Sequence, residues 1–252
     1  MESVENTPPQ GNKPLRIGHV ATGIGLSIVV SAIIGAAVVA YVQKDPMPLW
    51  IIALLQIPMW VGLLVPLIFF GKGNPRWKNQ LGIPLRKGKQ DELSFSPTRR
   101  TRKVLTIRQS IEGLLIGIFS QAVLTPLLYL PILIFVDDLD VSGPARELTD
   151  QAHGAGILLL ILIVVVGAPV FEELFFRGYA LRAFERRWSP ATALITSSIL
   201  FGLVHFQPLQ FPALVLFGFI AGKLAQRDEH IGRAVWAHVG FNAYTVFVLV
   251  YL

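Results

Sequence analysis

Long apolar runs dominate this sequence and constrain its fold more than any other feature. The segments 17–42 and 49–70 contain no Asp, Glu, Lys or Arg at all. Runs of about 18 or more such residues are long enough to cross a bilayer. Of the 252 residues, 53% are hydrophobic and only 15% are charged, whereas a soluble domain has about 25% charged residues. The sequence therefore predicts an integral membrane protein.

The apolar pattern predicts an all-α, polytopic bundle of about seven transmembrane helices (six to eight). These helices are expected near residues 17–42, 49–70, 111–135, 154–187, 190–205, 211–224 and 231–252. The chain divides into a disordered tail (1–16), N-terminal transmembrane helices (17–135) with a basic loop (71–110), and a helical core (154–252). In the first helix, Gly23, Ser27, Ser31 and Gly35 form a small-residue stripe that suits close helix packing.

The distribution of basic residues predicts the orientation in the membrane. With seven spans and a cytoplasmic N-terminus, 20 of the 22 Lys and Arg residues belong to the cytoplasmic side. Only Lys44 and Arg146 fall outside. The opposite orientation violates the positive-inside rule. We therefore expect a protein of the cell membrane with its N-terminus in the cytoplasm and its C-terminus outside.

Charge and cysteine content exclude several functions. The net charge of +6 is explained by cytoplasmic Lys and Arg that face anionic lipid, so membrane lipid rather than nucleic acid is the expected partner. The sequence has no cysteine, which excludes disulfides, thiolate metal sites and cysteine nucleophiles.

Ionisable residues inside the apolar helices are the candidates for function. A charge at the bilayer centre costs about 2.5–3.5 kcal/mol on insertion scales, so such residues usually face a cavity or each other. Glu173 and Arg177 are four residues apart and share a helix face, which predicts an ion pair. Glu172 lies about 100° around the same helix. It must find its partner on another helix.

Three helices bring polar side chains to similar depths. Glu172 and His205 each lie about 22 Å from the cytoplasmic helix ends, and His238 and Asn242 lie about 10–17 Å in, one turn apart. A carboxylate and an imidazole that share one water form a general-base site. The same residue types suit zinc, with Glu172, His205 and His238 as ligands. Chemistry alone leaves both interpretations open.

At these residues the sequence resembles the CAAX protease and bacteriocin-processing family, also called the Abi family, whose members include CAAX prenyl protease 2-like proteins. The first motif is Glu172 and Glu173, three further residues, and Arg177. The second is Phe201 with His205, and the third is His238 with Asn242. All three motifs occur in order, and the resemblance covers roughly residues 154–251.

The resemblance implies an intramembrane endopeptidase with a conical active-site cavity and no required cofactor. By family analogy, Glu172 and His205 activate a water, and His238 and Asn242 support the oxyanion. Glu173, Arg177 and Phe201 would be supporting residues. Zinc remains the alternative cofactor. The implied partner is a membrane-associated or lipidated protein or peptide substrate.

Two other functions fit intramembrane carboxylates. A proton-coupled transporter is one, although the sequence lacks the inverted repeat and paired broken helices that are typical of many transporters. A non-catalytic membrane immunity or adaptor protein with the same fold is the other.

Overall fold

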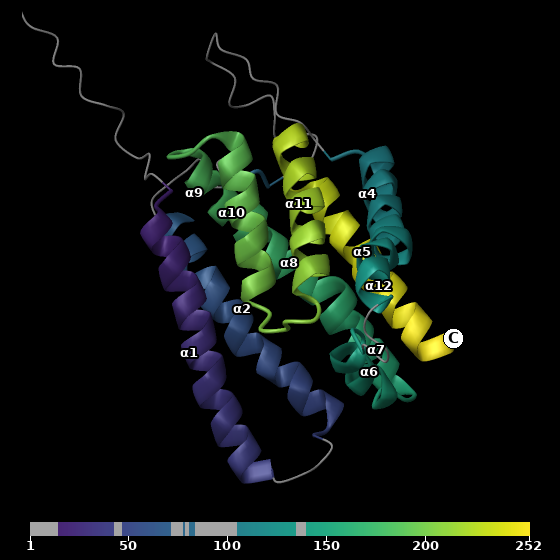
Figure 1. Ribbon diagram of the computed structural model, residues 1–252. Helices are drawn as coiled ribbons and strands as arrows, with labels where there is room; N and C mark the ends of the chain where they lie inside the picture. Colours follow the sequence, from purple (N-terminus) through teal and green to yellow (C-terminus); the bar gives the residue numbers. More distant parts are fainter. Residues whose placement is uncertain (1–14, 43–46, 72–77, 79–80, 84–104, 135–139) are drawn as a thin grey trace, which may run out of the picture.

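The computed structural model describes residues 15–42, 47–71, 78, 81–83, 105–134 and 140–252. Over these ranges the protein is a bundle of α-helices without strands (Figure 1). The predicted tail (1–16), apart from its last two residues, and most of the predicted basic loop (71–110) lie outside them. The all-α prediction is confirmed.

The N-terminal part of the chain forms α1 and α2, then a helix with a π-helical segment part-way, then a short helix. Their bounds are α1 Ile17–Val42, α2 Leu49–Gly71, α4 Ile107–Phe119, a π-helical segment Ser120–Leu124 (η2), α5 Thr125–Leu133 and α6 Gly143–Asp150. The first two helices begin and end almost where the apolar runs predict. The third begins four residues earlier than expected, because Thr106 and Gln109 form a capping box there. Helix α6 was not predicted.

The C-terminal part begins with one long helix that contains two π-helical segments, followed by three further helices. The long helix comprises α7 Ala155–Leu160, η3 Ile161–Gly167, α8 Ala168–Glu173, η4 Leu174–Ala180 and α9 Leu181–Glu185. The remaining helices are α10 Pro190–Leu203, α11 Phe211–Asp228 and α12 Gly232–Tyr251. The π-helical segments η3 and η4 directly flank α8, which carries Glu172 and Glu173. Such segments are often found at functional sites.

The helices account for the predicted bundle of about seven spans. Among the described residues, five helices are long and apolar enough to cross a membrane: 17–42, 49–70, 107–133, 155–185 and 232–251. Helices α10 and α11 complete the set. At 14 residues, α10 is only about 21 Å long, which is shorter than a hydrocarbon core of about 30 Å.

Helices α10 and α11 form a hairpin that stops inside the bundle. In Figure 1 the turn between them lies well above the lower ends of α1 and α2. The turn contains Phe206 in a left-handed conformation (φ 53°), which is unusual for a bulky residue. His205 therefore sits at a chain reversal at membrane depth rather than at the membrane surface.

Glycines allow α4 and α12 to touch along their backbones. A Cβ on Gly117 would collide with the carbonyl oxygen of Ala237, and one on Gly240 with that of Leu114. Nearer the start of both helices, a Cβ on Gly113 would lie 2.6 Å from the Arg233 carbonyl oxygen. Small residues at such crossings are typical of membrane helices. After Phe119, η2 and α5 no longer follow α12 in this way.

The small-residue stripe of α1 packs over half of its length. Ser27 lies against Gly62 of α2, and Gly23 lies against Pro66 and Phe175. No atom of the described residues lies within 4 Å of a Cβ built on Gly35, so the predicted packing is wrong at that end of the stripe.

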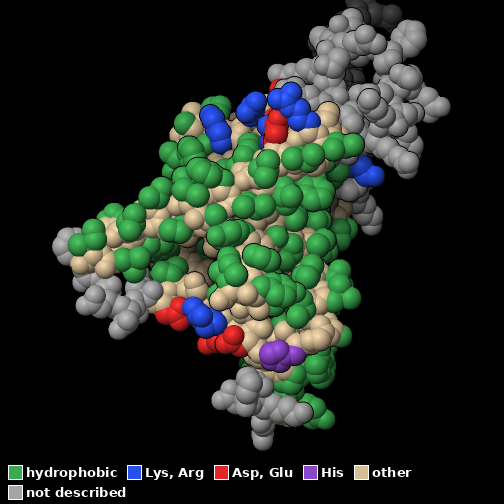
Figure 2. Space-filling view, turned by 90° about the vertical axis from the view of Figure 1, so that its right-hand side faces the viewer, with side chains coloured by type: hydrophobic (Ala, Val, Ile, Leu, Met, Phe, Trp, Pro, Cys, Tyr) green, Lys and Arg blue, Asp and Glu red, His purple; other side chains and the backbone are tan. Residues whose placement is uncertain are grey.

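Charges gather at the two ends of the bundle, with an apolar band between them (Figure 2). Exposed basic residues at the upper end include Arg108, Arg186, Arg187, Lys223 and Arg227. Among the described residues, the exposed charged ones at the lower end are Asp140, Arg146, Glu147 and Asp150. We call these the basic end and the acidic end.

Candidate active site

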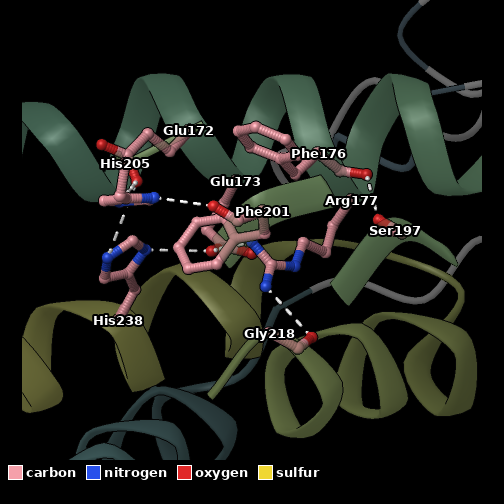
Figure 3. A network of polar contacts seen from close by, with 9 residues as sticks. All are labelled: Glu172, Glu173, Phe176, Arg177, Ser197, Phe201, His205, Gly218 and His238. Carbon is pink, nitrogen blue, oxygen red and sulfur yellow. Dashed lines mark hydrogen bonds and ion pairs between the residues drawn. The ribbon is translucent and has the colours of Figure 1, made fainter. Parts of the chain in front are cut away.

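Glu173 and Arg177 form the buried ion pair that their spacing predicts. The Arg177 Nη1 atom donates to Glu173 Oε1 at 2.8 Å, and both side chains are at most 1% exposed. The other guanidinium nitrogen, Nη2, donates to the Gly218 carbonyl on α11 at 3.0 Å. The guanidinium carbon lies 4.4 Å from the centre of the Phe201 ring. The pair thus connects η4 to α10 and α11 (Figure 3).

The same carboxylate also holds His238. Glu173 Oε1 lies 2.9 Å from His238 Nδ1, so one oxygen accepts from Arg177 and from the imidazole of α12. The His238 ring contacts the rings of Phe201 and Phe217, with centroids 5.8 and 4.8 Å away. His238 is therefore fixed in orientation by a charge-assisted hydrogen bond and by aromatic packing.

Glu172 points away from this pair and meets two histidines from other helices. Its Oε2 atom lies 3.7 Å from His205 Nε2 and 4.0 Å from His238 Nε2. Both distances exceed a direct hydrogen bond. Glu172 is only 7% exposed, and its Oε2 has no hydrogen-bond partner among the described residues. Three ionisable groups therefore converge on one point without bonding to each other directly.

The second nitrogen of each ring decides how these histidines face Glu172. His205 Nδ1 lies 2.7 Å from the Phe201 carbonyl oxygen. A carbonyl only accepts hydrogen bonds, so Nδ1 carries the proton. By the same argument, His238 Nδ1 donates to the Glu173 carboxylate. In the neutral rings, both Nε2 atoms therefore present lone pairs towards Glu172.

Asn242 lies one turn beyond His238 on α12, as predicted, but its amide is partly occupied. Its Nδ2 donates to the Val164 carbonyl in η3 at 2.8 Å. A π-helical turn frees backbone carbonyls that membrane helices must satisfy internally. One N–H of Asn242 therefore links α12 to η3, and the other remains available to a ligand.

All four predicted catalytic side chains line one cavity. It has a volume of about 680 Å³ and is lined by Glu172, His205, His238 and Asn242. The remaining wall comes from α2, η2, α5, α6, the long helix, α11 and α12. Ligand pockets typically have volumes of 300–1,000 Å³. The predicted intramembrane cavity is therefore present at the predicted residues.

Comparison with known proteins bears on the same segment. Residues 154–244 match the family model "Type II CAAX prenyl endopeptidase Rce1-like". Residues 154–244 form an Rce1-like domain. The match contains all three motifs, and the family resemblance inferred from them is confirmed.

Two curated relatives extend this similarity. The Bacillus subtilis (strain 168) protein named "Putative membrane peptidase YdiL" is 24% identical over 168 residues, which cover 65% of this chain and 61% of YdiL. The Lactococcus lactis subsp. lactis (strain IL1403) protein "UPF0177 protein YbdI" is 26% identical over 116 residues, 46% of this chain and 61% of YbdI. The aligned region thus spans about three fifths of each relative. No solved structure gives a significant match.

Zinc ligation by the Rce1-like domain was the alternative prediction for the same residues. The donor chemistry fits, because in the neutral rings both Nε2 atoms are free of hydrogen and both Nδ1 atoms donate to oxygen acceptors, as in metal-bound histidines. The spacing does not fit, because no group of three His, Asp or Glu side chains in the described ranges is arranged to hold a metal ion.

Sequence reasoning missed three contributors to the site of the Rce1-like domain. The Gly218 carbonyl anchors Arg177, and the Val164 carbonyl anchors Asn242. The uncharged polar cavity wall, which includes Gln121, was also missed. Backbone carbonyls leave no signal in the sequence. Gln121 is a polar residue in an apolar span, and this could have marked it as a cavity residue.

Proposed function

We propose that this protein is an intramembrane endopeptidase of the glutamate type. It hydrolyses a peptide bond in a membrane-associated protein or peptide, and the nucleophile is a water activated by Glu172 with His205. The observation that supports this most directly is the buried Glu172 Oε2, which has two imidazole Nε2 atoms at 3.7 and 4.0 Å. Groups separated by such distances are suitably placed to hold one water between them.

In this mechanism, Glu172 takes a proton from the water while the water oxygen attacks the carbonyl carbon of the substrate. The carbonyl oxygen becomes an oxyanion. It accepts a hydrogen bond from the free N–H of Asn242, and a His238 ring that holds a proton on both nitrogens before the attack donates a second one from Nε2 and keeps that proton afterwards. The tetrahedral intermediate then collapses, the C–N bond breaks, and the amine leaves with the proton that Glu172 had taken.

Glu173, Arg177 and Phe201 act as positioning residues in this proposal. Glu173 fixes the Nδ1 proton of His238, and Arg177 neutralises Glu173. Phe201 lies under Arg177 and contacts both histidine rings. The chemistry is therefore assigned to Glu172 and His205. The positioning of the histidine rings is assigned to Glu173, Arg177 and Phe201, which belong to the packed layer beside the cavity.

The test is cleavage of a membrane-anchored peptide library by purified protein in detergent or nanodiscs. Glu172→Gln should lower the cleavage rate by about 10²–10⁴, the usual contribution of a general base. Glu185→Gln is the matched control: Glu185 lies further along the same helix and bonds to Gln226 at the basic end, so its replacement should leave the rate unchanged. Full activity in Glu172→Gln would refute the proposal.

A zinc hydrolase is the alternative that the residue types leave open, although the spacing of the described side chains does not fit a metal ion. Glu172, His205 and His238 would then be the ligands, and the ion would supply an acidified water. Elemental analysis of active protein, combined with chelator treatment, separates the two mechanisms. The glutamate mechanism requires full activity without stoichiometric zinc, and loss of activity that zinc restores would establish the alternative.

A further inference from the structure

The cavity at Glu172 is closed towards the basic end. Along the long helix in that direction, Phe175, Phe176, Tyr179 and Ala180 are each 0% exposed, and Arg177 is 1% exposed. On α4 and α12, the backbone contact at Gly117 and Ala237 leaves no gap on the same side. In the part of the chain that the structure describes, these buried side chains close the cavity beyond Phe176 on the side of the basic end.

The cavity extends from Glu172 in the other direction. On the long helix its wall continues through Ala168, Val164 and Leu160, one residue per turn towards the acidic end. On α12 it continues from Asn242 to Thr245 and Val248. On the long helix, Phe176 is the last described residue that lines the cavity towards the basic end, and on α12 it is His238, so most of the lining of both helices lies on the acidic side of the catalytic residues.

The third wall of the cavity consists of α4, η2 and α5, and it explains why the cavity is open towards the acidic end. Helix α4 touches α12 through glycines, but the π-helical segment η2 separates α4 from α5, and α5 does not continue the close packing. The space beside α5 is lined by Gln121 and Thr125, and it reaches Ser142 at the start of α6. Figure 2 shows a recess above the charged residues of the acidic end.

The charges identify which side of the membrane this is. The sequence assigns 20 of its 22 basic residues to the cytoplasmic side, and the exposed ones among them lie at the end where the cavity is closed. The open side of the cavity faces the acidic end, where Asp140, Glu147 and Asp150 are exposed. Under the positive-inside rule this end is outside the cytoplasm.

We infer that the cavity receives its substrate from the non-cytoplasmic side of the membrane. The direction of opening depends on the geometry and the charge distribution alone, and the nature of the substrate rests on the proposed function. The substrate class is then a membrane-anchored peptide whose scissile bond lies outside the cytoplasm. A prenylated protein tail in the cytoplasm would not reach Glu172 through the packed layer.

Because the chain has no cysteine, single engineered cysteines test the direction of opening without any need for activity. Gln121→Cys lines the cavity, Ser189→Cys is exposed at the basic end, and Ile33→Cys faces outward on α1, where it is 65% exposed. Each variant is treated with a membrane-impermeant maleimide, first on intact cells and then on inverted membrane vesicles.

The inference expects Gln121→Cys to be labelled in intact cells. It expects Ser189→Cys to be labelled only in inverted vesicles, and Ile33→Cys in neither, since lipid surrounds it. Labelling of Gln121→Cys only in inverted vesicles would overturn the inference, as would its failure to react in both preparations. Labelling of Ser189→Cys in intact cells would overturn the assigned orientation.

A second measurement separates this inference from the proposed function. Two reporters carry the same cleavable peptide next to one transmembrane anchor, either outside or inside the cell. Cleavage of the outside reporter alone is expected, and cleavage of the inside reporter alone would contradict the inference. If neither reporter is cleaved while Gln121→Cys is labelled from outside, the proposed function fails and the direction of opening stands.

Discussion

Glu172 and Glu173 are neighbours in the chain but belong to two different regions of the molecule. Glu173 lies in a packed layer where Arg177 and His238 share one of its oxygens. Glu172 lies at the edge of the cavity and has no hydrogen-bond partner at Oε2 among the described residues. The packed layer uses charge to fix geometry, and the cavity leaves charge available for chemistry. A single residue step around a helix is enough to separate these two uses.

The largest expected difference between the two regions is in stability. Glu173→Gln leaves Arg177 buried without its counter-charge, which should lower the free energy of unfolding by about 3–5 kcal/mol. Glu172→Gln removes no hydrogen bond at Oε2 and should change it by less than about 1 kcal/mol. Unfolding in mixed micelles measures both. Equal losses in the two variants would show that the two carboxylates do not differ in role.

The glycine contacts of the packed half give the next effect. Gly117→Val would push a side chain into the backbone of α12 and should cost about 1–3 kcal/mol by overpacking. Gly35→Val is the control, because no described residue lies within 4 Å of a Cβ at Gly35. The same unfolding measurement applies. A Gly117→Val variant as stable as the control would argue against the close crossing of α4 and α12.

A smaller effect is expected in the open half. Tyr129 donates to the Leu209 carbonyl at 2.5 Å and so ties α5 to the α10–α11 turn. Tyr129→Phe should cost about 0.5–1.5 kcal/mol, the net value of one hydrogen bond. Tyr251→Phe, at an exposed position near the end of α12, should have no effect. If Tyr129→Phe matched its control, α5 would not be held to the turn in this way.

The smallest effect belongs to the surface of the basic end. Arg108 pairs with Glu112 at 2.7 Å, but its side chain is 88% exposed. Arg108→Gln should change stability by less than about 1 kcal/mol, because exposed ion pairs contribute little. Thermal unfolding at low and high salt would check this. A loss comparable to that of Glu173→Gln would mean that the contrast between buried and exposed charge does not apply here.

The sequence was sufficient for the parts of the fold that depend on apolar length and helical spacing. The segments 17–42 and 49–70 became helices almost as expected, and the spacing of Glu173 and Arg177 gave their ion pair. The sequence was insufficient where contacts between backbone atoms determine the structure. The π-helical winding around α8, the Val164 carbonyl that holds Asn242, and the crossing at Gly117 depend on atoms that every residue shares. No pattern of side chains marks them.

Helix α10 ends inside the bundle, and this gives His205 a second task. A helix end at membrane depth leaves carbonyl groups that need hydrogen-bond partners within the protein. The His205 ring satisfies one of these groups, because its Nδ1 donates to the Phe201 carbonyl in the last turn of α10. The residue assigned to the chemistry is therefore also the cap of its helix.

Removing the imidazole would both fray the end of α10 and remove the reactive nitrogen. An inactive His205→Ala variant would therefore not show which of the two changes caused the loss of activity. His205→Asn keeps a side-chain donor near the Phe201 carbonyl. Amide hydrogen exchange at 203–206 in both variants would show how much of the loss comes from the unravelled helix end.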